Sequence, residues 1–324
     1  MSVPRTGGRR RWTHPVVEWP VLFCSLWFTA RMGNADLVPL LTGLLVPVLA
    51  FTPYAAPVVL VSAVCAALLR RWVACAVAVG LLAAFGVAVL PRAIPDGGVA
   101  ASGPVLRVLT ANLRLGRASP PELVRLVRGL RPDVLSLQEL TGQAVAALRA
   151  AGLEELLPYR VAVPMTGATG SGLYARRPLR ALPMADIAQV GLAMPRAVLR
   201  ISGRAVEVTA VHLGRPLNPA GVAQWQRGFT LLPVPEPRGP VKVFAGDFNA
   251  TLDHAPMRTL LASGYRDAAD AAGAGLVPTF RYAPLPPITI DHVVADARCA
   301  VLRVSVHDLP GTDHHAVFAE LRLP

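Results

Sequence analysis

Acidic, amide and imidazole side chains follow short apolar runs at several points in the second two-thirds of this sequence. After the run VKVF, Asp247 and Asn249 lie two residues apart. In an extended segment, such residues project from the same face. Their carboxylate and amide oxygens are the donors that hard cations such as Mg²⁺ prefer. An Asx turn after a strand is the simpler interpretation, but the flanking pattern favours a site for a cation and a phosphate oxygen.

Other polar residues stand at the ends of apolar runs in the same way. Asn112 ends VLRVLTAN, Glu139 follows VLSLQ, and His212 ends AVEVTAVH. Each has a structural explanation when taken alone: a turn residue, an acid in the first turn of a helix, and a core histidine. Neighbouring strands that end at one sheet edge would bring Asn112 and Glu139 together, and a cation site would then explain both.

The last part of the chain supplies a second carboxylate and imidazole set. Asp291 lies in the apolar segment ITIDHVVAD, and Asp313 and His314 precede the final apolar run in GTDHHAVFAEL. A carboxylate beside an imidazole fixes its tautomer and stabilises its charged form, as acid–base chemistry requires.

The elements that must position these residues alternate in type from residue 105 onward. We expect a strand at 105–112, a helix that begins at the prolines 120–121, and strands that end at residues 139, 212 and 247. Prolines at the start of a helix and apolar residues at helical spacing support the helix. This alternation indicates an α/β domain over residues 105–324, long enough to bury its own core.

Charge and composition divide the chain at about residue 95. Residues 1–95 hold 8 Lys or Arg and 2 Asp or Glu, whereas residues 96–324 hold 24 and 18. The net charge of +12 therefore divides as +6 and +6. The first +6 lies beside apolar runs, which suggests anionic lipid, and the second shows no dense basic stripe of a dedicated nucleic-acid binder. Of the four cysteines only Cys299 is in the second part, which excludes a disulfide framework there.

Apolar runs near residues 15–30, 37–52, 54–69 and 72–90 predict about three transmembrane helices over residues 15–90. The last run has 19 residues and no charge, enough to cross a bilayer. A cleaved signal peptide does not explain several successive runs. The basic residues Arg9–Arg11 and Arg70–Arg71 favour a cytoplasmic side for the tail 1–14 and an extracytoplasmic side for the linker 91–104 and the domain 105–324. The lack of ionisable residues inside the runs favours an anchor over a transporter.

In order and in type, these motifs resemble the endonuclease/exonuclease/phosphatase superfamily of metal-dependent phosphoesterases, over residues 105–324. The resemblance implies a four-layer α/β/β/α sandwich of two mixed sheets. It implies Glu139 as the main ligand of a Mg²⁺ ion, for which Mn²⁺ would substitute, with Asn112 and Asp313 in the same pocket. The matching residues on the hydrolytic side of the site are His212, Asp247, Asn249, Asp291 and His314.

The family's mechanism implies a role for each of these residues. His314, polarised by Asp291, would activate the attacking water or stabilise the phosphorane. Asp247 would orient the nucleophile or protonate the leaving oxygen, and the base role could lie with either group. Asn249 would fix Asp247 and bind a phosphate oxygen, and His212 would bind another.

The motifs define a reaction but not a substrate. Helices followed by a catalytic domain also resemble the actinobacterial group that includes the VanJ proteins, and this favours a lipid-linked phosphate or pyrophosphate at the outer face of a lipid bilayer. The first alternative is an extracytoplasmic nuclease that binds nucleic acid through loop residues, for which the candidates are Tyr174, Arg176, Arg177 and Arg215. The second is an anchored binding module with a dead site, which the complete motif set argues against. No feature indicates a protein partner.

Overall fold

The computed structural model describes residues 15–38, 41–184 and 187–324, which divide into two compact units. Residues 15–29 and 53–88 form the first unit, and Ala30–Thr52 and Val89–Pro324 form the second. The second unit therefore holds the α/β region together with two stretches that precede it in the sequence.

Sheet one of the second unit has six strands in the order β11-β12-β1-β2-β4-β3. It is mixed, because β1 runs parallel to β2 and antiparallel to β12. Burial of β1 and β2 is nearly continuous, as expected of strands covered on both faces. The strands of this sheet are β1 (Val105–Asn112), β2 (Val134–Gln138), β3 (Tyr159–Val163), β4 (Ser171–Ala175), β11 (Ala300–His307) and β12 (Ala316–Arg322).

Sheet two also has six strands, in the order β5-β6-β7-β8-β10-β9. In this sheet β7 runs parallel to β8, and β10 runs antiparallel to β8. Its strands are β5 (Arg180–Leu182), β6 (Arg196–Ile201), β7 (Arg204–His212), β8 (Val241–Asp247), β9 (Tyr265–Asp267) and β10 (Asp291–Asp296).

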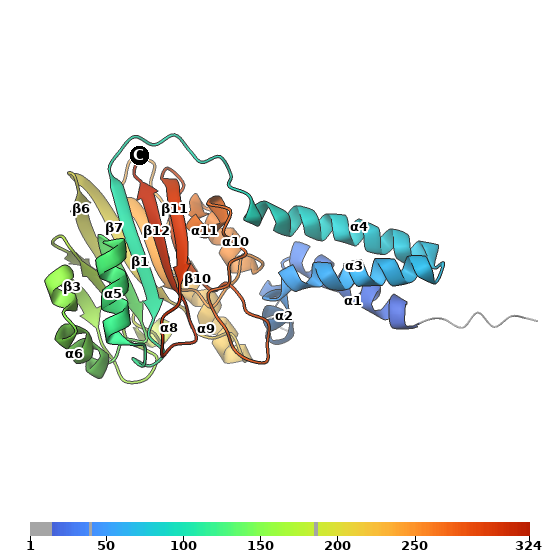
Figure 1. The fold of residues 1–324 in the computed structure, drawn as a ribbon, viewed down its shortest axis with the longest axis horizontal. Helices are drawn as coiled ribbons and strands as arrows, with labels where there is room; N and C mark the ends of the chain where they lie inside the picture. The colour runs from blue at the N-terminus through green and yellow to red at the C-terminus, as the bar shows by residue number, and fades with distance from the viewer. Residues whose placement is uncertain (1–14, 39–40, 185–186) are drawn as a thin grey trace, which may run out of the picture. The chain divides into compact units, whose positions relative to one another are not determined.

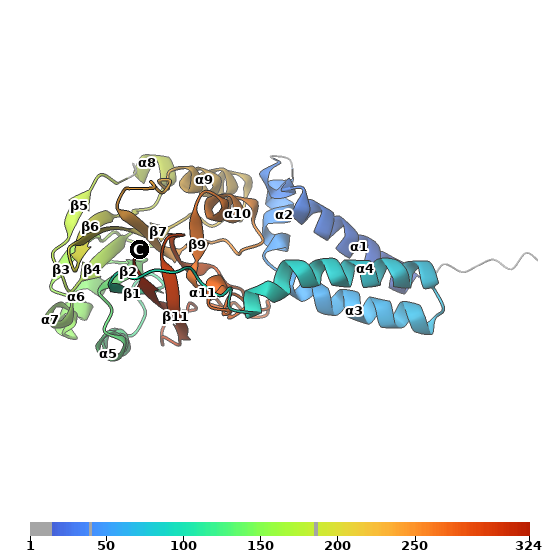
Figure 2. The same ribbon diagram turned by 90° about the horizontal axis from the view of Figure 1, so that it is seen from above.

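The two sheets pack face to face, and helices cover their outer faces (Figures 1 and 2). Small and branched apolar side chains such as Val108, Val208 and Val243 fill the space between the sheets. Outside sheet one lie α5, α6 and α7, and outside sheet two lie α9 and α10. The expected sandwich of two mixed sheets is thus confirmed. The helices of this region are α5 (Pro120–Leu130), α6 (Gly142–Ala150), α7 (Leu153–Leu156), α8 (Ile187–Val190), α9 (Pro219–Thr230), α10 (Ala255–Ala262) and α11 (Ala268–Ala271).

The stretch Ala30–Thr52 belongs to the second unit through specific polar contacts. It contains the end of α1 (Pro15–Met32), η1 (Ala35–Leu37) and α2 (Thr42–Leu49). The Asp36 carboxylate accepts a 2.7 Å hydrogen bond from the first backbone N–H of α10. The His254 Nε2 lies 2.8 Å from the carbonyl oxygen of Val46, whose side chain joins the core outside sheet two. This stretch therefore packs as part of the α/β unit.

The first unit consists of apolar helices with a small core of their own. Its parts are most of α1, α3 (Thr52–Leu68) and most of α4 (Trp72–Val89), which continues into η2 (Leu90–Ala93). Phe28 packs edge-on against Phe85, and Arg71 pairs with Glu18. Many large apolar side chains of this unit are exposed, among them Leu68, Val73 and Val87.

By length and composition, the described residues contain one or two candidate membrane spans. Trp72–Ala93 has 22 residues and a mean hydropathy of 2.7, and only 17% of its most apolar window is buried. Thr42–Leu49 and Thr52–Leu68 qualify only as one span bent by 77°. A core helix of a soluble protein would be mostly buried, so the exposure of Trp72–Ala93 agrees with a membrane segment. The expected count of about three spans is thus supported only in the coarser form of one or two.

Candidate active site

Strand ends from both sheets converge on one group of polar side chains. In sheet two, His212 at the end of β7 lies opposite Asp247 at the end of β8, and Asp247 lies opposite Asp291 at the start of β10. In sheet one, Asn112 ends β1 beside the end of β2, and Glu139 follows directly. Strand pairing thus brings the residues together within each sheet, and the packing of the two sheets brings both groups together.

Asn112 connects the two sheets at this edge. Its Nδ2 donates to Asp247 Oδ2 at 3.0 Å and to Glu139 Oε1 at 3.3 Å, and its side chain is buried. The Asn112 Oδ1 accepts a 2.9 Å hydrogen bond from the backbone N–H of Arg114. The amide therefore holds one carboxylate from each sheet in a fixed relation.

Glu139 presents a buried carboxylate to the centre of the site. Its Oε2 accepts a 2.7 Å hydrogen bond from the backbone N–H of Leu115, and Arg215 Nη2 lies 3.1 Å from its Oε1. Its backbone has a φ of 53°, a left-handed conformation that costs a non-glycine residue roughly 1–2 kcal/mol. Such outliers persist where the surroundings fix them, often at functional sites.

Asp247 lies between the two imidazoles of the site. Its Oδ2 is 3.9 Å from His212 Nε2 and 3.8 Å from His314 Nε2, and its Oδ1 accepts a 2.8 Å hydrogen bond from the backbone N–H of Asn249. Burial raises the pKa of Asp247, and the imidazoles act in the opposite direction. Gly246 is required before it, because a Cβ there would lie 1.8 Å from the carbonyl oxygen of Val211.

His314 and Asp291 form a buried acid–base pair. Both carboxylate oxygens of Asp291 lie within hydrogen-bond distance of His314 Nδ1, at 3.0 and 2.9 Å. Burial lowers the pKa of His314, but the Asp291 and Asp247 carboxylates outweigh it and raise the pKa to about 9. The ring of Phe280 packs on the imidazole at 4.7 Å between centroids. Nε2 is thus the nitrogen turned toward Asp247 and the centre of the site.

His212 is the second imidazole of the site. Burial lowers its pKa, while the nearby carboxylates of Asp247 and Glu139 act in the opposite direction. Its Nδ1 is buried and has no hydrogen-bond partner among the residues that the structure describes. Asn249 is fixed nearby, since its Nδ2 donates to the Leu213 carbonyl oxygen at 2.8 Å.

Asp313, the third predicted metal ligand, pairs with an arginine. Its carboxylate faces Arg114, with 3.5 Å between Oδ2 and the Arg114 Nε, and its backbone carbonyl accepts a hydrogen bond from Arg281. Among the described residues, its side chain forms no hydrogen bond or ion pair with Asn112 or Glu139. The preceding residue, Thr312, donates its hydroxyl to the Asn112 carbonyl oxygen at 3.0 Å, so Asp313 follows a residue that is joined to the site.

The donor set fits a divalent cation that favours oxygen ligands. Oxygen or nitrogen atoms of Asp247, Asp291 and His314 lie within 4.8 Å of one another, and all three residues are buried. Because Asp291 already holds His314 Nδ1, these two act more naturally as an acid–base pair. Glu139 and Asp247, which Asn112 joins, offer carboxylate oxygens alone. Two carboxylates in a buried pocket are compatible with the few protein ligands that Mg²⁺ usually takes.

A buried polar network beneath the site was not predicted from the sequence. Ser136 donates to the Ala245 carbonyl oxygen across the sheets at 2.7 Å, and Gln138 donates to Ser136 at 2.8 Å. Thr279 likewise accepts the backbone N–H of Asp291 at 2.9 Å. Polar residues within an otherwise apolar run, as in VLSLQ, are a usable signal for the first pair. Thr279 lies in a loop and offers no such signal.

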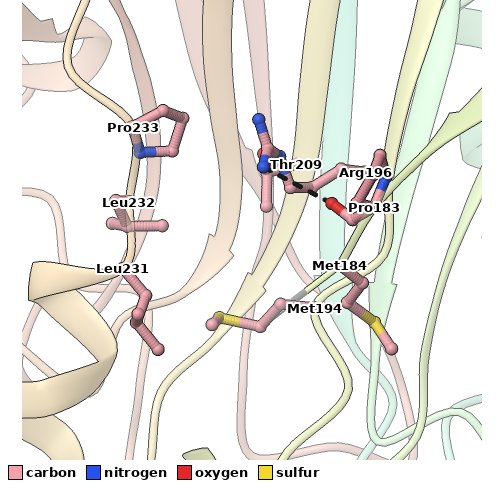
Figure 3. Close-up of a pocket in the computed structure, with 8 residues that line it drawn as sticks. All are labelled: Pro183, Met184, Met194, Arg196, Thr209, Leu231, Leu232 and Pro233. Carbon is pink, nitrogen blue, oxygen red and sulfur yellow. Dashed lines mark hydrogen bonds between the residues drawn. The ribbon is translucent and has the colours of Figure 1, made fainter. Parts of the chain in front are cut away.

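A separate cavity of about 220 Å³ lies on sheet two and includes none of the predicted site residues (Figure 3). It is bounded by Met194, Arg196, Thr209 and the loop at 231–233. Arg196 pairs with Glu207, so its charge is already balanced. The cavity is not the place where the strand ends converge.

Comparison with known proteins agrees with this architecture. Residues 109–314 match the model of the Endonuclease/Exonuclease/phosphatase family. A humanized D. rerio TDP2 has a TM-score of 0.54 and 15% identity, over 67% of this chain and 98% of its own. D. rerio TDP2 complexed with single strand DNA product has a TM-score of 0.51 and 14% identity, over 67% of this chain and 98% of its own. An endonuclease/exonuclease/phosphatase from Beutenbergia cavernae DSM 12333 has a TM-score of 0.51 and 20% identity, over 68% of this chain and 72% of its own. At these identities the structures show the fold alone. No curated protein matches the sequence.

Proposed function

We propose that this chain, which belongs to the endonuclease/exonuclease/phosphatase family and is a hydrolase of phosphoester bonds, is a Mg²⁺-dependent enzyme held at a membrane. One observation carries the proposal. The His314–Asp291 pair faces Asp247, which Asn112 joins to Glu139 at one edge of two sheets. An imidazole with a fixed tautomer and a carboxylate pocket are what hydrolysis of an anionic ester requires.

Each residue then has a distinct task. Glu139, with Asn112 and Asp313 as the further predicted ligands, would hold a Mg²⁺ ion, which supplies neutralisation of the phosphate charge. Asp291 holds the His314 ring so that it would activate the attacking water or stabilise the charge of the phosphorane. The raised pKa of about 9 favours the second role, because the imidazole is then protonated at neutral pH.

Asp247 would orient the nucleophile or protonate the leaving oxygen. His212 and Asn249 would bind non-bridging phosphate oxygens. Asp247 Oδ2 lies within 4 Å of Nε2 of both imidazoles, which supports this division of tasks.

The direct test is turnover of a generic phosphodiester or phosphomonoester by the full chain in detergent. We expect activity only with Mg²⁺ or Mn²⁺, and a loss of about 10²–10⁴-fold in His314→Ala, the usual contribution of a positioned acid or base. Metal-independent turnover would contradict the proposal. A fully active His314→Ala would contradict it as well, and a wild type with no turnover on any ester would favour a dead binding module.

For the substrate, we favour an amphiphilic phosphate ester or pyrophosphate with a lipid part. The loop that packs on His314 carries apolar side chains outward. Phe280 and Tyr282 stack with centroids 6.4 Å apart, and Tyr282 and Leu285 are 59% and 53% exposed. An apolar surface that adjoins a catalytic residue suits the apolar end of such a substrate. The resemblance to the VanJ-containing group adds to this as a prediction.

A nuclease is the second candidate, because arginines also border the site. Arg114 and Arg215 pair with Asp313 and Glu139, and both of these arginine side chains are about half exposed or more. The D. rerio TDP2 that carries a DNA product shares the fold, which by itself does not transfer a substrate. Of the candidates named from the sequence, Tyr174 is buried, so it is not available to stack on a base. Hydrolysis of lipid pyrophosphate in mixed micelles, compared with plasmid nicking, separates the two candidates.

For location, we propose multi-pass anchoring with the catalytic unit on the extracytoplasmic side. The exposed apolar side chains of α3 and α4 support an apolar solvent around them. The Arg71–Glu18 ion pair brings the start of α4 to the start of α1. This supports the proposal that both helices begin on the same side of the membrane. Trp72, exposed next to Arg71, has the side-chain type that concentrates at membrane interfaces.

Protease treatment of intact cells tests the orientation. We expect cleavage within the catalytic unit without permeabilisation. If the unit is protected until the membrane is broken, it lies in the cytoplasm, and the proposed three-span arrangement is wrong.

A further inference from the structure

One exposed arginine lies on the carboxylate that is predicted to bind the metal. Arg215 Nη2 is 3.1 Å from Glu139 Oε1, and the exposed fractions of the two side chains are 59% and 2%. The same oxygen accepts the Asn112 amide, while Oε2 accepts the N–H of Leu115. Arg215 is therefore the cationic partner of a carboxylate that is otherwise held by neutral donors.

Neighbouring residues hold the backbone of Arg215, while 59% of its side chain is exposed. Leu213, two residues before it, donates its N–H to the Asp247 carbonyl oxygen at 3.0 Å. On the other side, Gly221 of α9 packs so closely that a Cβ there would lie 2.6 Å from the Arg215 carbonyl oxygen. A side chain that starts from a fixed point beside Asp247 and is mostly exposed can reach different partners within the site.

A divalent cation at Glu139 would change the balance of this contact. Solvent screens the exposed Arg215 side of this ion pair, whereas a doubly charged ion on the same buried carboxylate would attract it more strongly and would repel the guanidinium. Once released, a guanidinium at this place faces the pocket in which phosphate oxygens would bind. Its planar fork can bind two phosphate oxygens at once.

We infer that Arg215 is an exchanging cation: it pairs with Glu139 in the metal-free protein and, when the metal binds, transfers to an anionic oxygen of the substrate. This inference rests on the proposed function, because it takes Glu139 as a metal ligand. It deepens that function by assigning a substrate-binding residue whose availability depends on the metal. Metal and substrate then bind cooperatively, since the metal releases the group that the substrate needs.

The first experiment measures Mn²⁺ binding to the substrate-free full chain in detergent, from the electron paramagnetic resonance signal of free Mn²⁺. In Arg215→Gln we expect binding about tenfold tighter, the effect of removing one charge near a divalent ion. Arg128→Gln removes the same charge from the exposed side of α5 and should leave the affinity unchanged. Glu139→Gln should weaken binding strongly.

The second experiment measures KM for bis(4-nitrophenyl) phosphate at saturating Mn²⁺. We expect KM to rise about tenfold in Arg215→Gln, the loss of a charge-assisted contact, and less in Arg215→Lys, which keeps the charge without the fork. Unchanged or weaker Mn²⁺ binding in Arg215→Gln would overturn the competition with the metal. Tighter Mn²⁺ binding with an unchanged KM would overturn the transfer to substrate. If Glu139→Gln binds Mn²⁺ like the wild type, the ligand assignment in the proposed function fails instead.

Discussion

Two Asp–His pairs with the same local geometry lie close together in the sequence, and burial distinguishes them. Asp291 lies 2.9 Å from His314 Nδ1, and Asp308 lies 2.8 Å from His315 Nδ1. The side chain of Asp291 is 2% exposed, whereas that of Asp308 is 84% exposed. A carboxylate in water is screened, so only Asp291 can hold and polarise its imidazole strongly.

At the residue scale, Asp291→Asn should therefore lower kcat by about 10²–10⁴-fold, because His314 loses the group that fixes its tautomer and stabilises its charge. KM should change little, since Asp291 is not expected to touch the substrate. Asp308→Asn is the matched control and should keep wild-type kcat. Steady-state kinetics of the three proteins with Mg²⁺ decide this. Equal losses in both variants would show that the buried pair has no special role.

The residues at the strand ends could be predicted from the sequence, but not all of their contacts could. Asp247 could be placed at the end of its strand, but the extended segment expected to continue to Asn249 was wrong, because β8 ends at Asp247. Asn249 has a φ of 46° and donates its N–H to Asp247 Oδ1, which is the Asx turn that the sequence also allowed. The approach of Arg215 to Glu139, residues 76 positions apart, depends on how two loops meet at the edge of the sheets. Loop conformations of this kind follow from tertiary packing, which no local pattern encodes.

At the scale of elements, the stretch around η1 and α2 differs most from what the sequence suggested. Its apolar residues have the composition of a membrane segment, and composition alone does not distinguish lipid from a protein core. Its polar contacts decide where it packs in this unit. Asp36 binds the start of α10, and Arg31 together with Arg92 of η2 binds Asp253, which is buried. These partners lie more than a hundred residues apart in the sequence.

Removal of one of these arginines should destabilise the second unit. Arg92 binds both carboxylate oxygens of Asp253 at 2.8 and 2.7 Å, and its side chain is 8% exposed. In Arg92→Ala, Asp253 keeps Arg31 but loses its bidentate partner, which should cost roughly 3 kcal/mol of unfolding free energy. Arg125→Ala breaks the exposed Arg125–Glu122 pair and should cost less than about 0.5 kcal/mol. Chemical denaturation measures both values, and similar losses would contradict the importance of burial.

The contact between His254 and α2 should make stability depend on pH. The Thr251 N–H donates to His254 Nδ1 at 2.8 Å, so His254 must be neutral and donate from Nε2 to Val46. Burial lowers its pKa in the folded protein. The unfolded chain therefore binds more protons than the folded one as pH falls below about 6.5, and stability is lost in that range.

Thermal unfolding between pH 8 and pH 5.5 tests this dependence. His254→Gln should be less stable than the wild type at pH 8, but its Tm should fall less steeply as the pH decreases. The difference between the two slopes isolates His254 from other histidines whose pKa values are also lowered, such as His307. Parallel slopes would show that His254 does not contribute.

At the scale of the whole molecule, the catalytic unit includes residues that precede its first strand in the sequence. The alternating pattern starts at Val105, and so does β1. Packing nevertheless extends the unit to Ala30–Thr52 and to the residues from Val89 onward. The sequence could place the sheets, because their strands are local and apolar. It could not place the stretches before them, because the partner of Arg31 and Arg92 is a carboxylate beyond residue 250.

A fragment that begins at residue 105 should consequently be less stable than the full chain. It lacks both arginines that pair directly with the Asp253 carboxylate, which should cost several kcal/mol. A fragment that begins at residue 89 retains Arg92 and should recover part of this stability. Unfolding of the full chain and both fragments, with Asp253→Asn introduced in each, measures the effect. The substitution should stabilise the 105–324 fragment relative to its parent and destabilise the full chain, since the full chain pairs the charge with both arginines and the 105–324 fragment with neither. If Asp253→Asn changes all three by the same amount, the early stretches are merely attached to the catalytic unit and do not complete it.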